Sequence, residues 1–369
     1  MKPNLFSPIQ IGDLKLRNRM VMAPLSRSRA TPEGVPTPLM IEHYRQRASA
    51  GLIITESAPI SHQGVGYPCT PGLYTPEQTA GWLRVVNAVH AQGGRIFAQL
   101  QHCGRISHNS HQPNRCVPVA PSAVLPDGVA FTATGYQPFE TPRALEAGEI
   151  KDVIAQYRQA AENCVAAGFD GVEVHAGNGY LIDQFLRDGT NKREDAYGGS
   201  TENRMRLLNE VLDAVTDVLP VGRVGVRLSP ENTFNSMSDS DPQRHFEEIV
   251  DNLSGRGLGY LHVLETSMDF GGHVAGASRT VDYGKLRKLF SGPYIANNGY
   301  TKERAEKAIQ SGHADLISFG AAFLSNPDLV RRFKKGLPLN KVDKSTFYTG
   351  GATGYTDYPQ FSAEFTDAA

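Results

Sequence analysis

Cysteine is scarce in this sequence and is nowhere arranged to bind a metal. The 369 residues include four cysteines, and no two of them form a Cys-x-x-Cys pair. A structural zinc site or a disulfide framework is therefore not expected. Because unpaired cysteines are typical of a reducing compartment, we expect a cytoplasmic protein without a bound metal.

Long hydrophobic runs and an excess of charge are also missing. No stretch approaches the roughly 18 apolar residues that a membrane span requires. The first residues contain no apolar core of the kind found in signal peptides. The 37 basic and 38 acidic residues leave a formal charge of −1. Because nucleic acids and anionic membranes bind basic surfaces, neither is an expected partner.

No Gly-x-Gly-x-x-Gly turn follows an early strand, as a doubly wound dinucleotide-binding sheet would require. Short apolar segments instead alternate with amphipathic helical patterns. Eight segments are predicted to be strands: Met20–Leu25, Leu52–Ala58, Arg95–Leu100, Gly171–His175, Val224–Ser229, Tyr260–Leu264, Tyr294–Asn297 and Asp315–Phe319. Their nearly continuous apolar character is typical of parallel strands that are buried on both faces.

Helical patterns separate these strands, and the clearest cover Glu149–Ala167, Arg204–Leu219 and Lys302–Ser311. Eight strand–helix units predict an α/β fold, a single-domain (β/α)₈ TIM barrel over residues 1–369.

Three segments lie outside this repeat. An N-terminal β-hairpin is expected from Leu5–Ile11 and Leu14–Val21, around the turn Gly12-Asp13. Residues 103–145 form a long excursion after the third strand, and loops of this length are usually functional or carry small elements of their own. The tail after Leu339 is expected to be loop-like.

Chemistry in a TIM barrel gathers at the carboxyl ends of the strands. The residues there are Pro24–Ser26, Glu56–Ala58, Gln99–His102, His175–Tyr180, Arg227–Pro230, Glu265, Asn297–Tyr300 and Phe319–Ala321. The set contains amides, imidazoles, hydroxyls and a guanidinium. It lacks the matched pair of carboxylates that a glycosidase needs.

Two features of this set admit a functional and a structural interpretation. Gly299 and Gly320 follow the seventh and eighth strands, where barrels often bind a phosphate, but glycines can also merely permit tight turns. Arg227 would need an anion or another electron-rich partner if it is buried, and a structural salt bridge would serve equally well.

The segment His175-x-x-Asn178-x-Tyr180 is the most unusual of these strand ends. His175 and Asn178 can both donate hydrogen bonds to one substrate oxygen, and Tyr180 can deliver a proton. Each could also be structural, as a buried histidine, a turn asparagine or a packed tyrosine. A zinc site is less expected, because no second histidine lies at ligand spacing.

The same residues carry a resemblance to a known family. The run HAGNGYLIDQFL, followed by YGGSTENR, closely resembles the signature of the Old Yellow Enzyme family, of the bacterial N-ethylmaleimide reductase type. The segments LFSPIQIGDLKLRNRMVMAPLSR, ASAGLIITES, SNPDLVRRF and FYTGGATGYTDYP are also similar to that family. The resemblance runs from Leu5 to about Pro359. It implies a flavoprotein oxidoreductase: an FMN-dependent ene-reductase that takes hydride from NADPH or NADH and reduces activated alkenes.

The resemblance also implies roles for residues that would bind FMN. Pro24 and Ala58 match residues lining the flavin ring, and Gln99 matches the amide that pairs with its pyrimidine edge. Arg227 matches a guanidinium beside the flavin N1 and O2, where a fixed cation should raise the reduction potential. Gly299 and Gly320 match the turns that hold the FMN phosphate.

The substrate site is implied in the same way. His175 and Asn178 match the pair that binds the substrate carbonyl oxygen, and Tyr180 matches the catalytic proton donor. Tyr67 matches an aromatic residue lining the substrate site. Tyr348 lies in a loop that packs beside the flavin in the family.

Three positions depart from the family pattern. Ser26 stands where threonine or cysteine is common, and it keeps a hydroxyl near the flavin O4. Gln101 replaces a tryptophan, so the substrate pocket should differ in shape and polarity. Ala321 replaces the arginine that grips the phosphate, and losing such a contact costs roughly 1.5–3 kcal/mol, which predicts weaker retention of FMN.

Two alternatives are considered beside this interpretation. The departures at Gln101 and Ala321 suggest a flavin- or ligand-binding barrel with little turnover. A multidomain enzyme similar to dienoyl-CoA reductase would need an iron–sulfur cysteine cluster and a second domain, which this sequence does not provide. The sequence leaves open a monomer or a homodimer.

Overall fold

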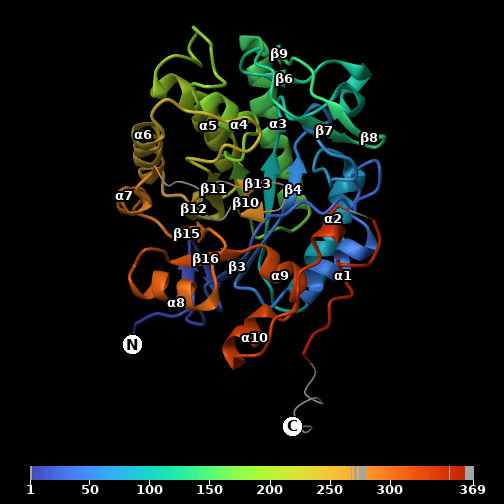
Figure 1. Ribbon diagram of the computed structural model, residues 1–369, viewed down its shortest axis with the longest axis vertical. Helices are drawn as coiled ribbons and strands as arrows, with labels where there is room; N and C mark the ends of the chain where they lie inside the picture. The colour runs from blue at the N-terminus through green and yellow to red at the C-terminus, as the bar shows by residue number, and fades with distance from the viewer. Residues whose placement is uncertain (1, 267, 270–271, 274–279, 349, 362–369) are drawn as a thin grey trace.

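Eight parallel strands close into a barrel, as the sequence predicts (Figure 1). The computed structural model describes residues 2–266, 268–269, 272–273, 280–348 and 350–361. The barrel strands in spatial order are β3 (Met20–Met22), β4 (Leu52–Pro59), β5 (Ile96–Gln101), β10 (Gly171–His175), β11 (Val224–Leu228), β12 (Tyr260–Leu264), β15 (Tyr294–Asn297) and β16 (Leu316–Phe319). The chain order of these strands is also their spatial order, which is the topology of a (β/α)₈ barrel.

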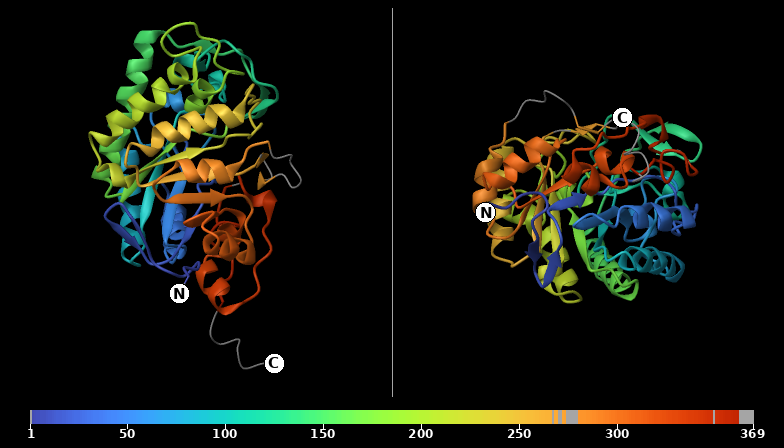
Figure 2. Two further views of the ribbon diagram at one scale, coloured as in Figure 1. Left: turned by 90° about the vertical axis from the view of Figure 1, so that its left-hand side faces the viewer. Right: turned by 90° about the horizontal axis from the view of Figure 1, so that it is seen from below.

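Helices follow the strands and surround them (Figure 2). They are α1 (Pro38–Gln46), α2 (Pro76–His90), α3 (Ala147–Ala166), α4 (Leu181–Leu186), α5 (Thr201–Thr216), α6 (Pro242–Ser254), α7 (Tyr283–Leu289), α8 (Lys302–Gln310), α9 (Ala321–Ser325) and α10 (Leu329–Lys335). The long helices start at side chains that satisfy free backbone N–H groups. Thr75 and Gln78 form a capping box at α2, and Ser200 caps α5.

The N-terminal hairpin closes one end of the barrel. Strands β1 (Ile9–Ile11) and β2 (Leu14–Leu16) pair antiparallel and pack against buried barrel residues such as Phe97 and Tyr260. The predicted second strand of the hairpin was too long, because Met20–Met22 belongs to the barrel. Gly12 has φ +52°, and a Cβ there would lie 2.4 Å from a backbone oxygen, so the turn requires glycine.

The excursion after β5 carries elements of its own, as expected. It contains β6 (Val119–Ala120), which pairs with β9 (Arg143–Ala144), and a hairpin of β7 (Val129–Thr132) and β8 (Gly135–Pro138). A second small hairpin, β13 (Met268–Asp269) with β14 (Gly272–His273), follows β12.

Short 3₁₀ turns complete the fold: His62–Gly64, Asn109–His111, Pro113–Arg115, Val221–Arg223 and Lys344–Thr346. The last of these interrupts a tail that is otherwise irregular, as predicted. In the part of the chain that the structure describes, no helix is both long enough and apolar enough to cross a membrane.

Candidate active site

A cavity of about 790 Å³ lies where the carboxyl ends of several barrel strands meet. It is lined by Pro24, Leu25, Ser26, Ser28, Ser57, Tyr67, Gln99, Phe131, Tyr136, His175, Asn178, Tyr180, Arg227, Phe234 and Tyr348. Nine of the predicted site residues are therefore brought together: Pro24, Ser26, Tyr67, Gln99, His175, Asn178, Tyr180, Arg227 and Tyr348. Its mixture of aromatic and polar walls suits a cofactor and a small substrate.

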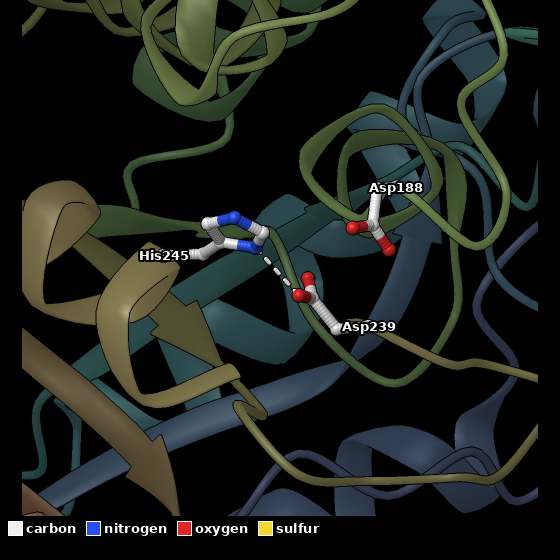
Figure 3. Close-up of side chains that lie close together, drawn as sticks. All are labelled: Asp188, Asp239 and His245. Carbon is white, nitrogen blue, oxygen red and sulfur yellow. Dashed lines mark hydrogen bonds and ion pairs between the residues drawn. The ribbon is translucent and has the colours of Figure 1, made fainter. Parts of the chain in front are cut away.

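A separate cluster of ligand-type side chains lies outside this cavity (Figure 3). Among the described residues, Asp188, Asp239 and His245 place their ligand atoms within 4.8 Å of one another. His245 Nδ1 is 2.5 Å from Asp239 Oδ1, and Asp188 accepts hydrogen bonds from the backbone N–H and the hydroxyl of Ser240. These contacts explain the cluster as two hydrogen-bonded groups beside a turn, and we assign no metal to it.

The floor of the cavity is a buried hydrogen-bond network around Arg227. Its Nη1 lies 2.8 Å from His262 Nε2, and its Nη2 donates to Asn297 Oδ1 at 3.1 Å. His262 Nδ1 lies 2.8 Å from Glu173 Oε2, and Gln99 Nε2 donates to Glu173 Oε1 at 2.7 Å. One carboxylate therefore balances the buried guanidinium through an imidazole, and it also orients the Gln99 amide.

Glu173 and Arg227 each favour the charged form of the other. Burial alone would raise the pKa of the Glu173 carboxyl, but His262 and Arg227 hold that pKa below its ordinary value. Burial lowers the pKa of Arg227, and Glu173 opposes the shift. Arg227 Nε is buried without a hydrogen-bond partner. A guanidinium edge that lacks a protein acceptor in the wall of a cavity is suited to an electron-rich ligand.

His175 ends β10 and is only 2% exposed. Burial and the nearby charge of Arg227 hold its pKa well below the ordinary value, so the imidazole is neutral near pH 7. Its Nδ1 is buried and has no hydrogen-bond partner. The ring meets Tyr180 edge to face, with centroids 5.2 Å apart. A neutral imidazole at this position can donate one hydrogen bond into the cavity without carrying charge.

Asn178 is held in a left-handed conformation with φ +58°, which asparagine tolerates better than most residues. Its N–H donates to Ser229 Oγ at 2.6 Å, and its carbonyl accepts from Asn235 Nδ2 at 2.7 Å. Asn232 Nδ2 donates to Asn178 Oδ1 at 3.4 Å. With its oxygen engaged by the protein, the carboxamide is left to present N–H groups to the cavity.

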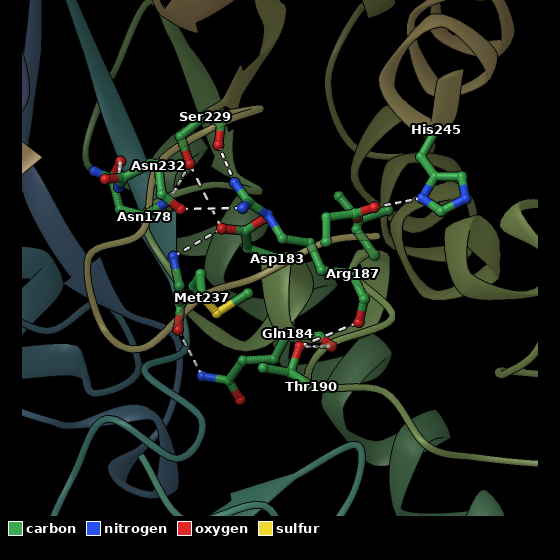
Figure 4. A network of polar contacts seen from close by, with 12 residues as sticks. Asn178, Asp183, Gln184, Arg187, Thr190, Ser229, Asn232, Met237 and His245 are labelled. Carbon is green, nitrogen blue, oxygen red and sulfur yellow. Dashed lines mark hydrogen bonds and ion pairs between the residues drawn. The ribbon is translucent and has the colours of Figure 1, made fainter. Parts of the chain in front are cut away.

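A buried ion pair between Asp183 and Arg187 stabilises the turn that contains Asn178 (Figure 4). Arg187 Nε donates to Asp183 Oδ1 at 3.0 Å, and both side chains are at most 2% exposed. Asp183 Oδ2 accepts from the Gly179 N–H at 2.8 Å. Arg187 also donates to the carbonyls of Ser229 and Asn232. The pair therefore joins the segment after β10 to the segment after β11, which together hold Asn178.

Tyr180 lies at the start of α4, and its hydroxyl is 3.1 Å from the hydroxyl of Tyr67. Burial raises the pKa of both phenols above the ordinary value. Both are therefore protonated near neutral pH, and Tyr180 can act as a proton donor.

The C-terminal tail returns to the cavity and is held there by two arginines. Arg27 donates to the carbonyls of Phe347 and Gly354, and Arg29 donates to those of Thr346 and Phe347. This anchorage brings Tyr348, 41% exposed, into the cavity wall. The sequence predicts Tyr348 at the site only through the family resemblance. The hydrogen bonds from Arg27 and Arg29 explain why the tail brings it there.

Glu56 lies beneath this anchorage and accepts from the N–H of Arg27 at 3.1 Å. Its other oxygen accepts from the Tyr44 hydroxyl at 3.3 Å. Burial raises the pKa of its carboxyl to about 7.

Several cavity residues were not predicted from the sequence. Phe131 and Tyr136 come from the hairpin β7–β8, and Phe234 comes from the segment after β11. These three aromatic residues lie beyond the strand ends that the prediction considered. An aromatic residue on each strand of a hairpin within a long excursion is a signal that could have found two of them. Ser28 was also missed, whereas Ser57 belongs to the predicted strand-end set but was given no role of its own.

Five predicted residues do not line the cavity. Ala58 and Gln101 are buried in β4 and β5, and the register of β4 against β5 shifts between Ile54 and Ser57. Gln101 is 3% exposed, and its Nε2 donates to Cys103 Sγ at 2.9 Å. Gly299, Gly320 and Ala321 lie where the neighbouring strands β15 and β16 end.

Buried histidines should make the fold sensitive to acid. Burial is the main cause that lowers the pKa of His43, His102, His175 and His262, to about 3 for His102 and about 4 for His262. Below about pH 6.5 the unfolded chain binds protons on these residues that the folded chain does not. Each such proton costs up to about 1.4 kcal/mol of stability per pH unit. Burial also raises the pKa of the Glu56 and Asp183 carboxyls, which opposes part of this loss.

The expected result is a lower Tm at about pH 5 than at about pH 7.5, measured by differential scanning fluorimetry. A Tm that stays constant or rises on acidification would show that these histidines are not held neutral.

Comparison with known proteins agrees with this site. A family model described as "NADH:flavin oxidoreductase / NADH oxidase family" matches residues 4–340. A Leishmania infantum protein described as a "Probable flavin mononucleotide-dependent alkene reductase" is 44% identical, with 96% of this chain and 97% of that protein covered.

Solved structures agree as well. Morphinone reductase in complex with tetrahydroNAD is 46% identical with a TM-score of 0.91, covering 98% of this chain and 99% of that one. The Old Yellow Enzyme homologue from Zymomonas mobilis is 44% identical with a TM-score of 0.92, covering 97% and 99%. The resemblance seen in the sequence is therefore confirmed, and this chain belongs to the NADH:flavin oxidoreductase / NADH oxidase family.

Proposed function

We propose that this chain reduces the carbon–carbon double bond of α,β-unsaturated carbonyl compounds, with bound FMN and with NADPH or NADH as the hydride source. The observation that carries the proposal is the convergence of His175, Asn178 and Tyr180 with Arg227 and Gln99 in one cavity. Two neutral donors, a proton donor and a buried cation are the groups that such a reduction needs.

The residues present fit FMN. The chemistry that FMN supplies when bound is transfer of a hydride from a nicotinamide to an organic acceptor. Gln99 and Arg227 would hold the polar edge of the ring, since both face the cavity and Arg227 Nε lacks a protein acceptor. Pro24 and Ser26 would contact the ring from the segment after β3. Gly299 and Gly320 would hold the phosphate. Ala58 is fully buried and does not line the cavity, so its neighbour Ser57 would contact the ring in its place.

His175 and Asn178 would bind the substrate carbonyl oxygen. Each donates one hydrogen bond, and a carbonyl oxygen has two lone pairs to accept them. Two preorganised donors stabilise the negative charge that develops on this oxygen as the β-carbon accepts hydride. Because His175 is neutral over the physiological pH range, this stabilisation should not depend on its ionisation.

Tyr180 would then protonate the α-carbon. Its hydroxyl lies against the Tyr67 hydroxyl, which can orient the proton and stabilise the phenolate left after transfer.

The walls favour flat, largely apolar alkenes. Tyr67, Phe131, Tyr136, Phe234 and Tyr348 give the cavity aromatic surfaces on several sides. Aromatic faces pack well against planar conjugated compounds such as cyclic enones and maleimides. Nitro compounds share the planar acceptor geometry and belong to the same proposed range. Gln101 would shape the pocket only indirectly, from its buried position in β5.

Reconstitution tests the proposal. The protein incubated with FMN and then freed of excess ligand should retain flavin absorbance. It should oxidise NADPH or NADH in proportion to added 2-cyclohexenone. Absence of flavin after reconstitution would contradict the proposal. A retained flavin without enone-dependent turnover would favour a binding protein with little turnover.

Residence in the cytoplasm and a monomeric or homodimeric state remain predictions. Size-exclusion chromatography with light scattering distinguishes a monomer or dimer from a larger assembly.

A further inference from the structure

The turn between β15 and α8 contains a buried amide that the protein does not use. Asn298 is 1% exposed, and both its Oδ1 and its Nδ2 lack a hydrogen-bond partner. Its neighbour Asn297 is fully engaged, since its Oδ1 accepts from Arg227 and its Nδ2 donates to the Ser318 carbonyl. An amide that is buried with neither end satisfied destabilises the protein unless a ligand or an ordered water supplies the missing partner.

The position of Asn298 indicates which ligand this is. The next residue, Gly299, has φ +53° and turns the chain toward α8, whose first N–H groups point back at the turn. The Asn297–Ser318 hydrogen bond ties the end of β15 to β16, so this turn lies beside the one at Gly320. Turns that lead from a strand into a helix can bind an anion through their backbone N–H groups.

The turn at Gly320 lacks the arginine that the family resemblance leads us to expect. Position 321, immediately after Gly320, is alanine, where the resemblance leads us to expect an arginine that grips the phosphate. Arg304 is the cation seen at the turn, donating to the Gly299 carbonyl at 3.4 Å while lying over the Tyr300 ring. Arg304 is exposed, so its charge is screened by solvent and ions.

We propose that Asn298 Nδ2 donates a hydrogen bond to the FMN phosphate, and that this amide replaces the arginine contact missing at Ala321. The inference rests on the proposed FMN site and identifies a phosphate-binding side chain within it. Because the amide is neutral and buried, it contributes a directed hydrogen bond rather than a net charge.

Paired titrations with FMN and riboflavin test this role, because riboflavin carries the same ring without the phosphate. Asn298→Ala should weaken FMN binding by about 10- to 150-fold, the range for one hydrogen bond to a charged group. The Kd of the Asn298→Ala protein for riboflavin should stay within about twofold of the Kd of the unmodified protein. Quenching of flavin fluorescence on binding to flavin-free protein measures both constants.

A stability measurement separates ligand binding from a structural role. Removing an unsatisfied buried amide should leave the Tm of the flavin-free protein unchanged or raised. Asn298→Asp provides a second variant of nearly the same shape, and it should weaken FMN binding more than alanine does because it places negative charge beside the phosphate.

The possible outcomes are distinct. An FMN affinity that is unchanged in Asn298→Ala would overturn the inference, and so would an equal loss of affinity for FMN and riboflavin. A lower Tm of the flavin-free Asn298→Ala protein would also contradict it. If the unmodified protein binds neither flavin, the proposed function fails instead.

Discussion

Tyr180→Phe should slow oxidation of the reduced protein by an enone by about 10²–10⁴-fold, the usual contribution of a positioned proton donor. Reduction of the flavin by NADPH should keep its rate, because that step needs no proton at the substrate α-carbon. The substitution removes only the hydroxyl and keeps the ring that meets His175. Anaerobic stopped-flow measurement of the two half-reactions separates these effects.

Tyr67→Phe is the matched control. Its hydroxyl contacts Tyr180 at 3.1 Å but is proposed only to orient the proton, so its loss should slow the enone step less than the loss of the Tyr180 hydroxyl. Equal rates for Tyr180→Phe and the unmodified protein would show that the proton reaches the α-carbon from another donor.

The second large effect concerns stability. Arg187→Ala should lower the free energy of unfolding by about 3–5 kcal/mol, because it leaves the Asp183 carboxylate buried without its cation. It also removes hydrogen bonds to the carbonyls of Ser229 and Asn232. Without Arg187, the segment after β10 would no longer be tied to the segment after β11, and Asn178 would be held less firmly. The KM of the folded variant for enones should therefore rise.

Arg158→Ala provides the comparison, since Arg158 pairs with Asp217 at 2.9 Å on the surface. Such an exposed pair contributes at most about 1 kcal/mol. Urea unfolding of both variants measures the difference. Similar losses in the two variants would contradict the role assigned to the buried pair.

The barrel could be predicted because its signal is local. Strands buried on both faces appear as short apolar runs, and each of the eight predicted runs overlaps a barrel strand. The strand ends differ more: the sequence predicts one strand over Met20–Leu25, but β3 ends at Met22. Pro24 and Leu25 lie beyond this end, in the cavity wall, where the chain leaves the sheet to form the site.

The rest of the site depends on contacts between distant parts of the sequence. Tyr348 reaches the cavity because Arg27 and Arg29 bind the tail more than 300 residues away. Tyr136 reaches it through a hairpin of the excursion. No periodic pattern reports such contacts. The unsatisfied amide of Asn298 was equally invisible in the sequence, because its burial depends on how two neighbouring turns meet.

The central claim is that this protein, with FMN bound, reduces an activated double bond. The most direct test mixes the NADPH-reduced protein with 2-cyclohexenone in the absence of oxygen, and with cyclohexanone as the matched saturated compound. We expect the enone to restore the absorbance of oxidised flavin and to yield one equivalent of cyclohexanone per flavin, while added cyclohexanone has no effect. A reduced protein that only oxygen reoxidises would contradict it.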